Sequence, residues 1–165
     1  MSDFEIRPAT AADIEAVASI LQEAASWQEA QGAPLWNAVD LTPDALQGEV
    51  SAGLYWIALS GDEAVGCLRY QLEDPLFWPD AAFGEAAYVH RLAVRRSHAG
   101  GALSSALLDW AKAHARERGH DFLRLDCDAG REKLREFYEQ HGFTLAGERE
   151  VGSHSVVLYE FDLSS

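Results

Sequence analysis

The stretch that decides the fold is residues 86–105, AAYVHRLAVRRSHAGGALSS. Its first nine residues, 86–94, are mostly apolar and predict a buried strand. A loop with two glycines follows, and 101–118 then carries apolar residues at helical spacing, with Gly119 as a stop signal. A further apolar run at 122–127 predicts the next strand. A strand, a helix and a strand in this order form the unit that builds a parallel strand pair.

The flanking segments predict further strands and helices. Thr10 with Asp13 is typical of a helix start, and Thr42-Pro43 is typical of another. The expected elements are a strand at 4–7, a helix from Thr10 to about Trp27, a short helix from Thr42, strands at 54–59 and 64–72, a loop at 73–83, a helix at 131–141, and strands at 143–151 and 155–161. The order β-α-α-β-β-β-α-β-α-β-β predicts a single domain of the α/β class.

The charge of the chain restricts its partners. The chain has 165 residues, 48% of them apolar, and a formal net charge of −14. So acidic a protein does not favour nucleic acid or anionic membranes. Residues 91–135 depart from this balance, with ten Lys and Arg against six Asp and Glu. That local excess fits either a solvated helix or a site for an anionic cofactor.

Targeting and cysteine patterns point to the cytoplasm. Cys67 and Cys127 lie in apolar runs, without CxxC motifs or Cys/His clusters of zinc spacing, so we expect buried thiols and no metal site. Buried free thiols fit a reducing compartment. The first residues, MSDFEIRP, are charged and do not resemble a signal peptide. Apolar runs long enough to span a membrane are absent from the sequence.

Four segments together carry a resemblance to a known family. They are 6–13 (IRPATAAD), Val65-Gly66, 88–94 (YVHRLAV) with Leu107-Leu108 thirteen residues later, and 137–143 (FYEQHGF). In this order they resemble the GNAT (GCN5-related N-acetyltransferase) superfamily over nearly the whole chain. The resemblance implies a mixed sheet of about seven strands with a splay between the fourth and fifth, about four flanking helices, and acetyl transfer from acetyl-CoA.

The resemblance implies a cofactor site around the end of the core strand and the helix start. Its expected members are Leu92, Ala93, Val94, Arg95, Arg96, Ala99, Gly100, Gly101, Ala102, Leu103, Ser104, Ser105 and Arg131. Where the family usually has Gln or Arg, then Gly, then Gly or Ala, this chain has Ala99, Ala102 and Ser104. Backbone amides at the helix start favour a pyrophosphate, and Arg95 and Arg96 offer positive charge. The alternative is that the altered loop binds CoA weakly or not at all. Arg131 either contacts a CoA phosphate or is a surface residue.

The resemblance also implies an acid and leaves the base open. Tyr138 matches the family's tyrosine that protonates the departing thiolate. The family's usual glutamate position holds Tyr88 instead, so the candidate bases are His90 and Glu85. An imidazole suits this role, although a hydrogen-bonded core histidine fits His90 equally well. Deprotonation through water or without assistance is a further alternative.

The acceptor is expected to be a primary amine of a small molecule or a peptide. Trp27, Trp36, Trp78 and Tyr88, with acidic neighbours, are expected to line its site; aromatic anchoring of the loops is the alternative. The last strands offer an edge for a homodimer. The alternative interpretation of the whole chain is a non-catalytic module that binds acyl-CoA or a protein partner.

Overall fold

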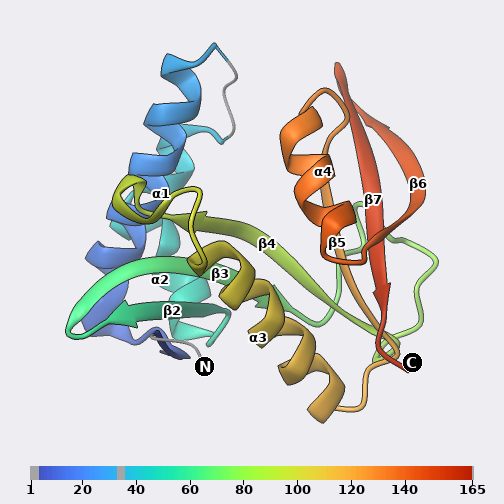
Figure 1. The fold of residues 1–165 in the computed structure, drawn as a ribbon, viewed down its shortest axis with the longest axis horizontal. Coiled ribbons are helices and arrows are strands. Elements are labelled where there is room, and N and C mark those ends of the chain that lie inside the picture. The colour runs from blue at the N-terminus through green and yellow to red at the C-terminus, as the bar shows by residue number, and fades with distance from the viewer. Residues whose placement is uncertain (1–3, 33–35, 165) are drawn as a thin grey trace. The chain divides into compact units, whose positions relative to one another are not determined.

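The computed structural model describes residues 4–32 and 36–164. Within them the chain forms seven strands and four α-helices in the predicted order (Figure 1). The strands are β1 (Glu5–Pro8), β2 (Tyr55–Ser60), β3 (Glu63–Gln71), β4 (Ala86–Val94), β5 (Phe122–Asp128), β6 (Thr144–Val151) and β7 (His154–Asp162). The helices are α1 (Ile14–Ala30), α2 (Pro43–Ser51), α3 (Leu103–Glu117) and α4 (Glu132–Gln140), with 3-10 turns η1 (Ala11–Asp13), η2 (Ala38–Leu41) and η3 (Arg96–His98).

The strands form one mixed sheet in the order β1-β2-β3-β4-β5-β7-β6. Strands β4 and β5 pair in parallel, with Ala86–Tyr88 opposite Phe122–Arg124. The pairs β1 with β2, β2 with β3, β5 with β7 and β6 with β7 are antiparallel. The mixed α/β architecture expected from the sequence is therefore confirmed.

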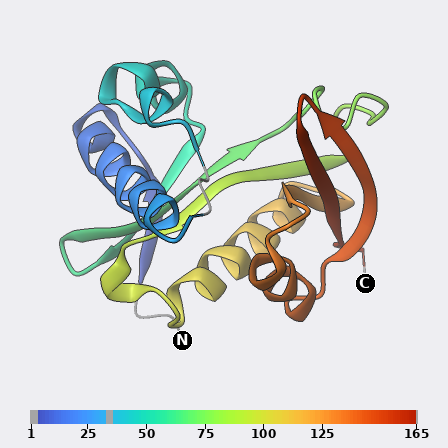
Figure 2. The same cartoon turned by 90° about the horizontal axis from the view of Figure 1, so that it is seen from above.

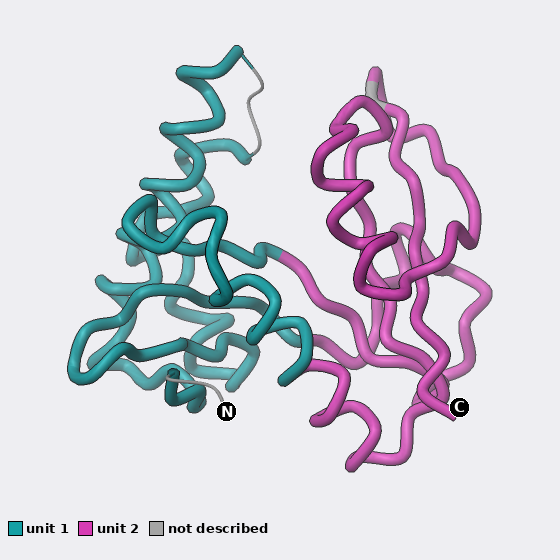
Figure 3. Tube along the Cα trace, in the orientation of Figure 1, with its two compact units in different colours: residues 1–70, 91–110 teal, residues 71–90, 111–165 magenta. Residues whose placement is uncertain are grey.

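The chain divides into two compact units, coloured separately in Figure 3. The first contains residues 1–70 and 91–110, and the second contains residues 71–90 and 111–165. Strand β4 and helix α3 each contribute residues to both units. The boundary within β4 falls between His90 and Arg91.

The core of the first unit lies on the face of β2 and β3 that α1 and α2 cover (Figure 2). Tyr55 and Ile57 point into this core, and both are fully buried. Because side chains alternate along a strand, Trp56 points to the opposite face, where it packs on Trp110 of α3 with ring centroids 4.4 Å apart. Burial of both strand faces explains why the hairpin is apolar throughout.

Gly66 of β3 allows α3 to approach the sheet closely. A Cβ atom at this position would lie 3.2 Å from the carbonyl oxygen of Ala93 and from side-chain carbons of Leu103 and Leu107. The Leu103 and Leu107 side chains of α3 therefore pack directly on the backbone of β3 at Gly66.

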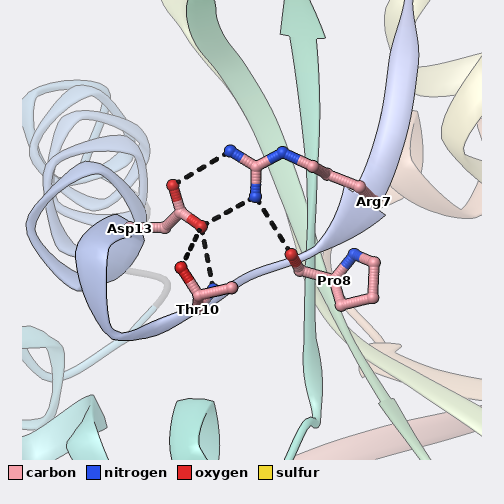
Figure 4. Close-up of polar contacts among 4 residues, drawn as sticks. All are labelled: Arg7, Pro8, Thr10 and Asp13. Atoms are coloured by element: carbon pink, nitrogen blue, oxygen red, sulfur yellow. Dashed lines mark hydrogen bonds and ion pairs between the residues drawn. The ribbon is translucent and has the colours of Figure 1, made fainter.

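The start of α1 is held by an ion pair (Figure 4). Asp13 accepts hydrogen bonds from the Arg7 guanidinium at 2.8 Å and from the Thr10 backbone N–H at 2.8 Å. These bonds lower the pKa of Asp13 to about 2, with the Arg7 bond as the largest cause. The helix start predicted from Thr10 and Asp13 is confirmed, and the 3-10 turn η1 precedes the α-helix.

The second unit packs α4 against β5 and β7. The ring of Tyr138 on α4 lies 6.0 Å from that of Phe143 and 6.2 Å from that of Tyr159 on β7. The opposite face of the same strands carries polar groups: Arg124 on β5 pairs in register with Glu160 on β7. This polar face includes Tyr88 and His90, which follow each other at alternate positions of β4.

Two predicted boundaries were wrong. Helix α1 continues past Trp27 to Ala30, because Gln28, Glu29 and Ala30 favour helix and the next glycine, at 32, comes later. Strand β5 continues past the predicted end at 127 and includes both Asp126 and Asp128. Antiparallel pairing with Leu158 and Val156 of β7 extends the strand through these polar residues.

Both thiols are buried, as predicted. Burial raises the pKa of Cys67 and of Cys127 to about 12, which leaves both sulfur atoms protonated and unreactive at neutral pH. Among the helices that the structure describes, none has the length and apolar character needed to cross a membrane.

Candidate active site

The expected cofactor residues of the first unit lie along the end of β4, the following loop and the start of α3. Ala93 is buried, Val94 is half-buried, and Gly100, Gly101 and Ala102 are exposed. Gly100 has a φ of 77°, a conformation that favours glycine. The expected set is thus contiguous in this unit apart from Arg131, which precedes α4 in the second unit.

The start of α3 has the properties of an anion site. The first backbone N–H groups of an α-helix have no acceptor within the helix, and the helix dipole favours negative charge there. Ala102 precedes the helix and Ser104 lies in its first turn, where it is half-buried. The small side chains from Ala99 to Ala102 leave the backbone accessible to a phosphate.

The two arginines of the loop contact α1. Arg95 donates hydrogen bonds to the Ala64 carbonyl at 3.0 Å and to Glu23 at 3.4 Å. The guanidinium of Arg96 lies 3.7 Å from the ring centroid of Trp27. The backbone N–H of Arg96 donates to Glu23 at 2.6 Å. In this arrangement the arginines hold the loop against α1.

Arg91 interrupts the regular geometry of β4. Its φ is 52°, the left-handed region, and it is the one non-glycine residue with positive φ among the described residues. Its guanidinium donates to the Tyr55 hydroxyl at 3.0 Å and lies 3.7 Å from Glu49. Since such a conformation costs about 1 to 3 kcal/mol, these partly buried contacts hold a backbone irregularity next to Leu92 and Ala93.

The second unit places His90 between two carboxylates. Its Nε2 lies 3.1 Å from Oδ2 of Asp74, and its Nδ1 lies 3.4 Å from Oδ1 of Asp126. The side chains of the three residues are 15%, 9% and 16% exposed, respectively. A neutral imidazole carries a single N–H and can donate to only one of these two carboxylates.

Glu85 belongs to a neighbouring network around Arg124. The Arg124 guanidinium is nearly buried and donates to Glu85 at 2.9 Å, to Glu160 at 3.0 Å and to the Tyr88 hydroxyl at 3.3 Å. The ring of Trp78 covers it at 4.4 Å. Burial lowers the pKa of Arg124, and the hydrogen bonds to Tyr88, Glu85 and Glu160 more than compensate, so the group is charged.

Tyr138 is buried, and its pKa is raised, chiefly because burial disfavours the phenolate. The phenol therefore keeps its proton across the working pH range. A group in this state can donate a proton and cannot accept one.

The aromatic residues expected at the acceptor divide between the units. Trp36 lines a cavity of about 520 Å³ between α1 and η2, with Gln22, Glu29 and Asn37 among its other walls. Trp78 lines a second cavity of about 190 Å³ with Asp80, Glu85, Arg124 and Arg149. Trp27 is 36% exposed and covered by Arg96, and Tyr88 is buried against Arg124.

Sequence reasoning missed the environment of His90. Asp74 lies in a loop whose path no periodicity predicts, and the strand predicted at 122–127 gave no indication that Asp126 lies next to His90. The available signal was the alternation of β4 and β5, because Tyr88 and Arg124 are register partners and the next positions on the same face are His90 and Asp126. Arg124, a charged residue inside an apolar strand, was a second unused signal.

Comparison with known proteins identifies the family. Residues 16–143 match the acetyltransferase (GNAT) family. The uncharacterized N-acetyltransferase YesJ of Bacillus subtilis is 28% identical over 169 residues, covering 98% of this chain and 92% of that protein. A GNAT-family acetyltransferase from Listeria monocytogenes is similar in structure, with a TM-score of 0.79 at 23% identity, covering 96% of this chain and 94% of that one.

A further solved structure contains the cofactor. The PaiA N-acetyltransferase of Thermoplasma acidophilum, determined in complex with coenzyme A, has a TM-score of 0.76 at 18% identity, covering 98% of this chain and 99% of that one. The family match also decides between the enzyme and the non-catalytic module that the sequence left open. The chain belongs to the acetyltransferase (GNAT) family and is an N-acetyltransferase that uses acetyl-CoA.

Proposed function

We propose that the enzyme acetylates a primary amine of a small molecule or a peptide by direct attack, in the cytoplasm. The observation that carries this proposal is the position of His90 between Asp74 and Asp126. The carboxylates attract a cationic ammonium group, and the imidazole provides a base next to them. The net charge of −14 adds a general attraction for cationic acceptors.

The residues of the cofactor region fit coenzyme A. The support is the combination of an accessible loop backbone, small side chains at Gly100, Gly101 and Ala102, and the start of a 15-residue helix. Free N–H groups at such a helix start hold a pyrophosphate, and Ser104 adds a hydroxyl. When bound, acetyl-CoA supplies the acetyl group as a thioester, which an uncharged amine can attack.

His90 acts as the base in this proposal. In the tautomer that this role requires, Nδ1 carries the hydrogen and faces Oδ1 of Asp126 at 3.4 Å, and Nε2 accepts a proton beside Asp74. An acceptor ammonium that binds here donates one N–H to Asp74 and loses another proton to Nε2. The neutral amine keeps its electron pair for the attack.

Tyr138 holds the proton for the departing thiolate on its hydroxyl, as the resemblance implies. The role requires a protonated phenol, and burial raises the pKa of Tyr138 and so keeps the proton on its hydroxyl. Backbone N–H groups near Ala93 and Val94 are the proposed donors to the carbonyl oxygen. Glu85 contributes through its ion pair with Arg124 and is a weaker candidate for the base.

Each of the two aromatic cavities is by itself a candidate site for the acceptor. In the cavity with Trp36 and Glu29, the aromatic ring can bind an apolar or cationic group and the carboxylate can pair with a cation. The cavity with Trp78 has two acidic residues, Asp80 and Glu85, and two basic ones, Arg124 and Arg149, so it offers partners for both charges of a polar acceptor. A homodimer through β6, the strand at one end of the sheet order, is proposed on the same grounds of an available edge; light scattering of the purified chain measures it.

Steady-state acetylation across a panel of amines tests the function. We expect His90→Gln to lower kcat by about 10²-fold or more while the KM for acetyl-CoA is unchanged. His120→Gln, which alters an exposed histidine bonded to the Gly84 carbonyl, is the matched control. Equal kcat values for wild type and His90→Gln would remove His90 from the mechanism, and lack of turnover on every amine would contradict the acceptor class.

A further inference from the structure

Asp74, His90 and Asp126 form a group of metal-ligand types that the family assignment does not explain. One ligand atom from each residue lies within 4.8 Å of the other two. The three residues come from the loop after β3, from β4 and from β5, and all belong to the second unit. Sequence spacing therefore gives no sign of them, which is why the sequence led us to expect no metal site.

The hydrogen-bonding of this group is incomplete. Oδ2 of Asp74 is buried and accepts no hydrogen bond, and the ring nitrogen Nε2 of His90 lies 3.1 Å from it. Its other oxygen accepts the Phe77 backbone N–H at 3.4 Å, and its backbone carbonyl accepts the Trp78 N–H at 2.8 Å. The loop thus holds Asp74 in place with one oxygen directed at the imidazole.

With a neutral imidazole, the group carries two negative charges and a ring nitrogen lone pair directed at a carboxylate oxygen. A cation between that nitrogen and that oxygen satisfies both atoms. Imidazole nitrogen and carboxylate oxygen are the ligands that Zn²⁺ takes at about 2.0 to 2.2 Å. Two such ligands on one tetrahedral ion lie about 3.4 Å apart by geometry, close to the observed 3.1 Å between Nε2 and Oδ2.

We propose that Asp74, His90 and Asp126 bind one divalent transition-metal ion, with Zn²⁺ as the preferred probe. Rotation of the Asp126 carboxylate completes three protein ligands, and water fills the fourth position. Since the ion takes the nitrogen that serves as the base, Zn²⁺ inhibits acetyl transfer. The inhibition, but not the binding, rests on the proposed function.

Calorimetric titration of the metal-free, tag-free protein with ZnCl₂ tests the site without any activity measurement. We expect one Zn²⁺ per chain, and a Kd at least about tenfold weaker in Asp74→Asn, His90→Gln and Asp126→Asn. Glu73→Gln, an exposed neighbour of Asp74, and His120→Gln are matched controls with unchanged Kd. Thermal unfolding without metal checks that each variant is folded.

Two results would overturn the site: no stoichiometric binding to the wild type, or equal affinity in the wild type and all three ligand variants. Visible absorption of the Co²⁺ complex provides a second readout, because the band intensity reports tetrahedral coordination. Zn²⁺ should inhibit turnover at concentrations near the calorimetric Kd, and EDTA should reverse the inhibition. That result supports the proposal that Nε2 of His90 is both the metal ligand and the catalytic base. Stoichiometric binding without inhibition supports the site and contradicts the role of His90 as base, so the two proposals fail separately.

Discussion

Glu23 of α1 accepts the backbone N–H of Arg96 at 2.6 Å, and the same carboxylate lies 3.4 Å from the Arg95 guanidinium. One acidic side chain thus ties the loop after β4 to a helix more than seventy positions earlier in the chain. Trp27, one turn further along α1, adds its ring beneath Arg96. The loop proposed to receive the cofactor phosphates is therefore held in position before any ligand binds.

Replacement of this carboxylate should weaken cofactor binding. We expect Glu23→Ala to raise the KM for acetyl-CoA several-fold with a small change in kcat, because the loop backbone loses its fixed position. Glu15→Ala, an exposed acid on the same helix, is the control with unchanged KM. A KM for Glu23→Ala equal to that of the wild type would show that the loop needs no such support.

Removal of the Tyr138 hydroxyl should affect turnover without affecting cofactor affinity. We expect Tyr138→Phe to reduce kcat by about 10²-fold with an unchanged Kd for acetyl-CoA, because the buried phenol is the proposed proton donor. Since its pKa is raised, the wild-type rate should show no loss from phenolate formation as the pH rises toward 10, the ordinary pKa of tyrosine. Tyr70→Phe, at a buried tyrosine of β3, is the control; a similar loss there would indicate a general packing effect.

Arg124 should be important for stability. Arg124→Met leaves Glu85 and Glu160 without their common partner, and we expect a loss of about 1 to 3 kcal/mol in the free energy of unfolding. The expected loss is smaller than for a fully buried ion pair, because both glutamates are partly exposed and water can solvate them. Urea unfolding measures the change. Arg149→Met, an exposed arginine of the same cavity, should change stability by less than about 0.5 kcal/mol.

The Arg7–Asp13 ion pair predicts a pH dependence of stability. The pKa of Asp13 falls from its ordinary 3.8 to about 2 in the folded protein. A depressed carboxyl pKa gives stability that is present above about pH 4 and is lost as the pH falls through about 2. Asp13→Asn should cost about 1 kcal/mol near neutral pH, and the difference from wild type should shrink toward pH 2 in urea unfolding.

The control for this pH dependence is Asp62→Asn, in the exposed turn between β2 and β3. Its effect should be small at every pH. A constant difference between wild type and Asp13→Asn across the acid range would contradict the ion-pair explanation.

Alanine substitutions at Gly142 and Gly119 can distinguish the cost of backbone strain from the cost of a steric contact. Gly142 has a φ of 86°, and a Cβ atom there would lie 2.9 Å from a ring carbon of Phe161. Gly119 has a similar φ of 83° with no atom within 4 Å of its Cβ position. Alanine at Gly119 should cost about 1 kcal/mol from backbone strain, and alanine at Gly142 should cost more because of the added contact. Equal costs in urea unfolding would exclude a contribution from Phe161.

Much of the fold was predictable from the chain because its signals are local. The hairpin of β2 and β3 follows from two apolar runs around a polar turn, and the capped starts of α1 and α2 follow from Thr10 and Thr42. The site was less predictable because its chemistry depends on residues distant in sequence. His90 was a candidate from its place on β4, whereas Asp74 comes from an irregular loop, whose path depends on tertiary contacts.

The cofactor region shows the same division. Its place at the end of β4 follows from the pattern of a strand, a loop and a helix. The same pattern does not predict the contacts of Arg95 and Arg96 with α1, because the sequence around an arginine does not indicate which distant helix its side chain will contact. The sequence suggested a direct role for both arginines at the phosphates, and that role remains a prediction beside their observed contacts with Glu23 and Trp27.

The glycine at position 66 has a consequence for how this enzyme can vary. Because β3 has no side chain at Gly66, the distance between this part of the sheet and the start of α3 depends on the strand backbone and on the Leu103 and Leu107 side chains. A methyl group at residue 66 would force the Ala93 carbonyl and the Leu103 and Leu107 side chains to shift by a few tenths of an ångström. Gly66 therefore helps to set how closely the start of α3, the proposed diphosphate site, approaches the sheet.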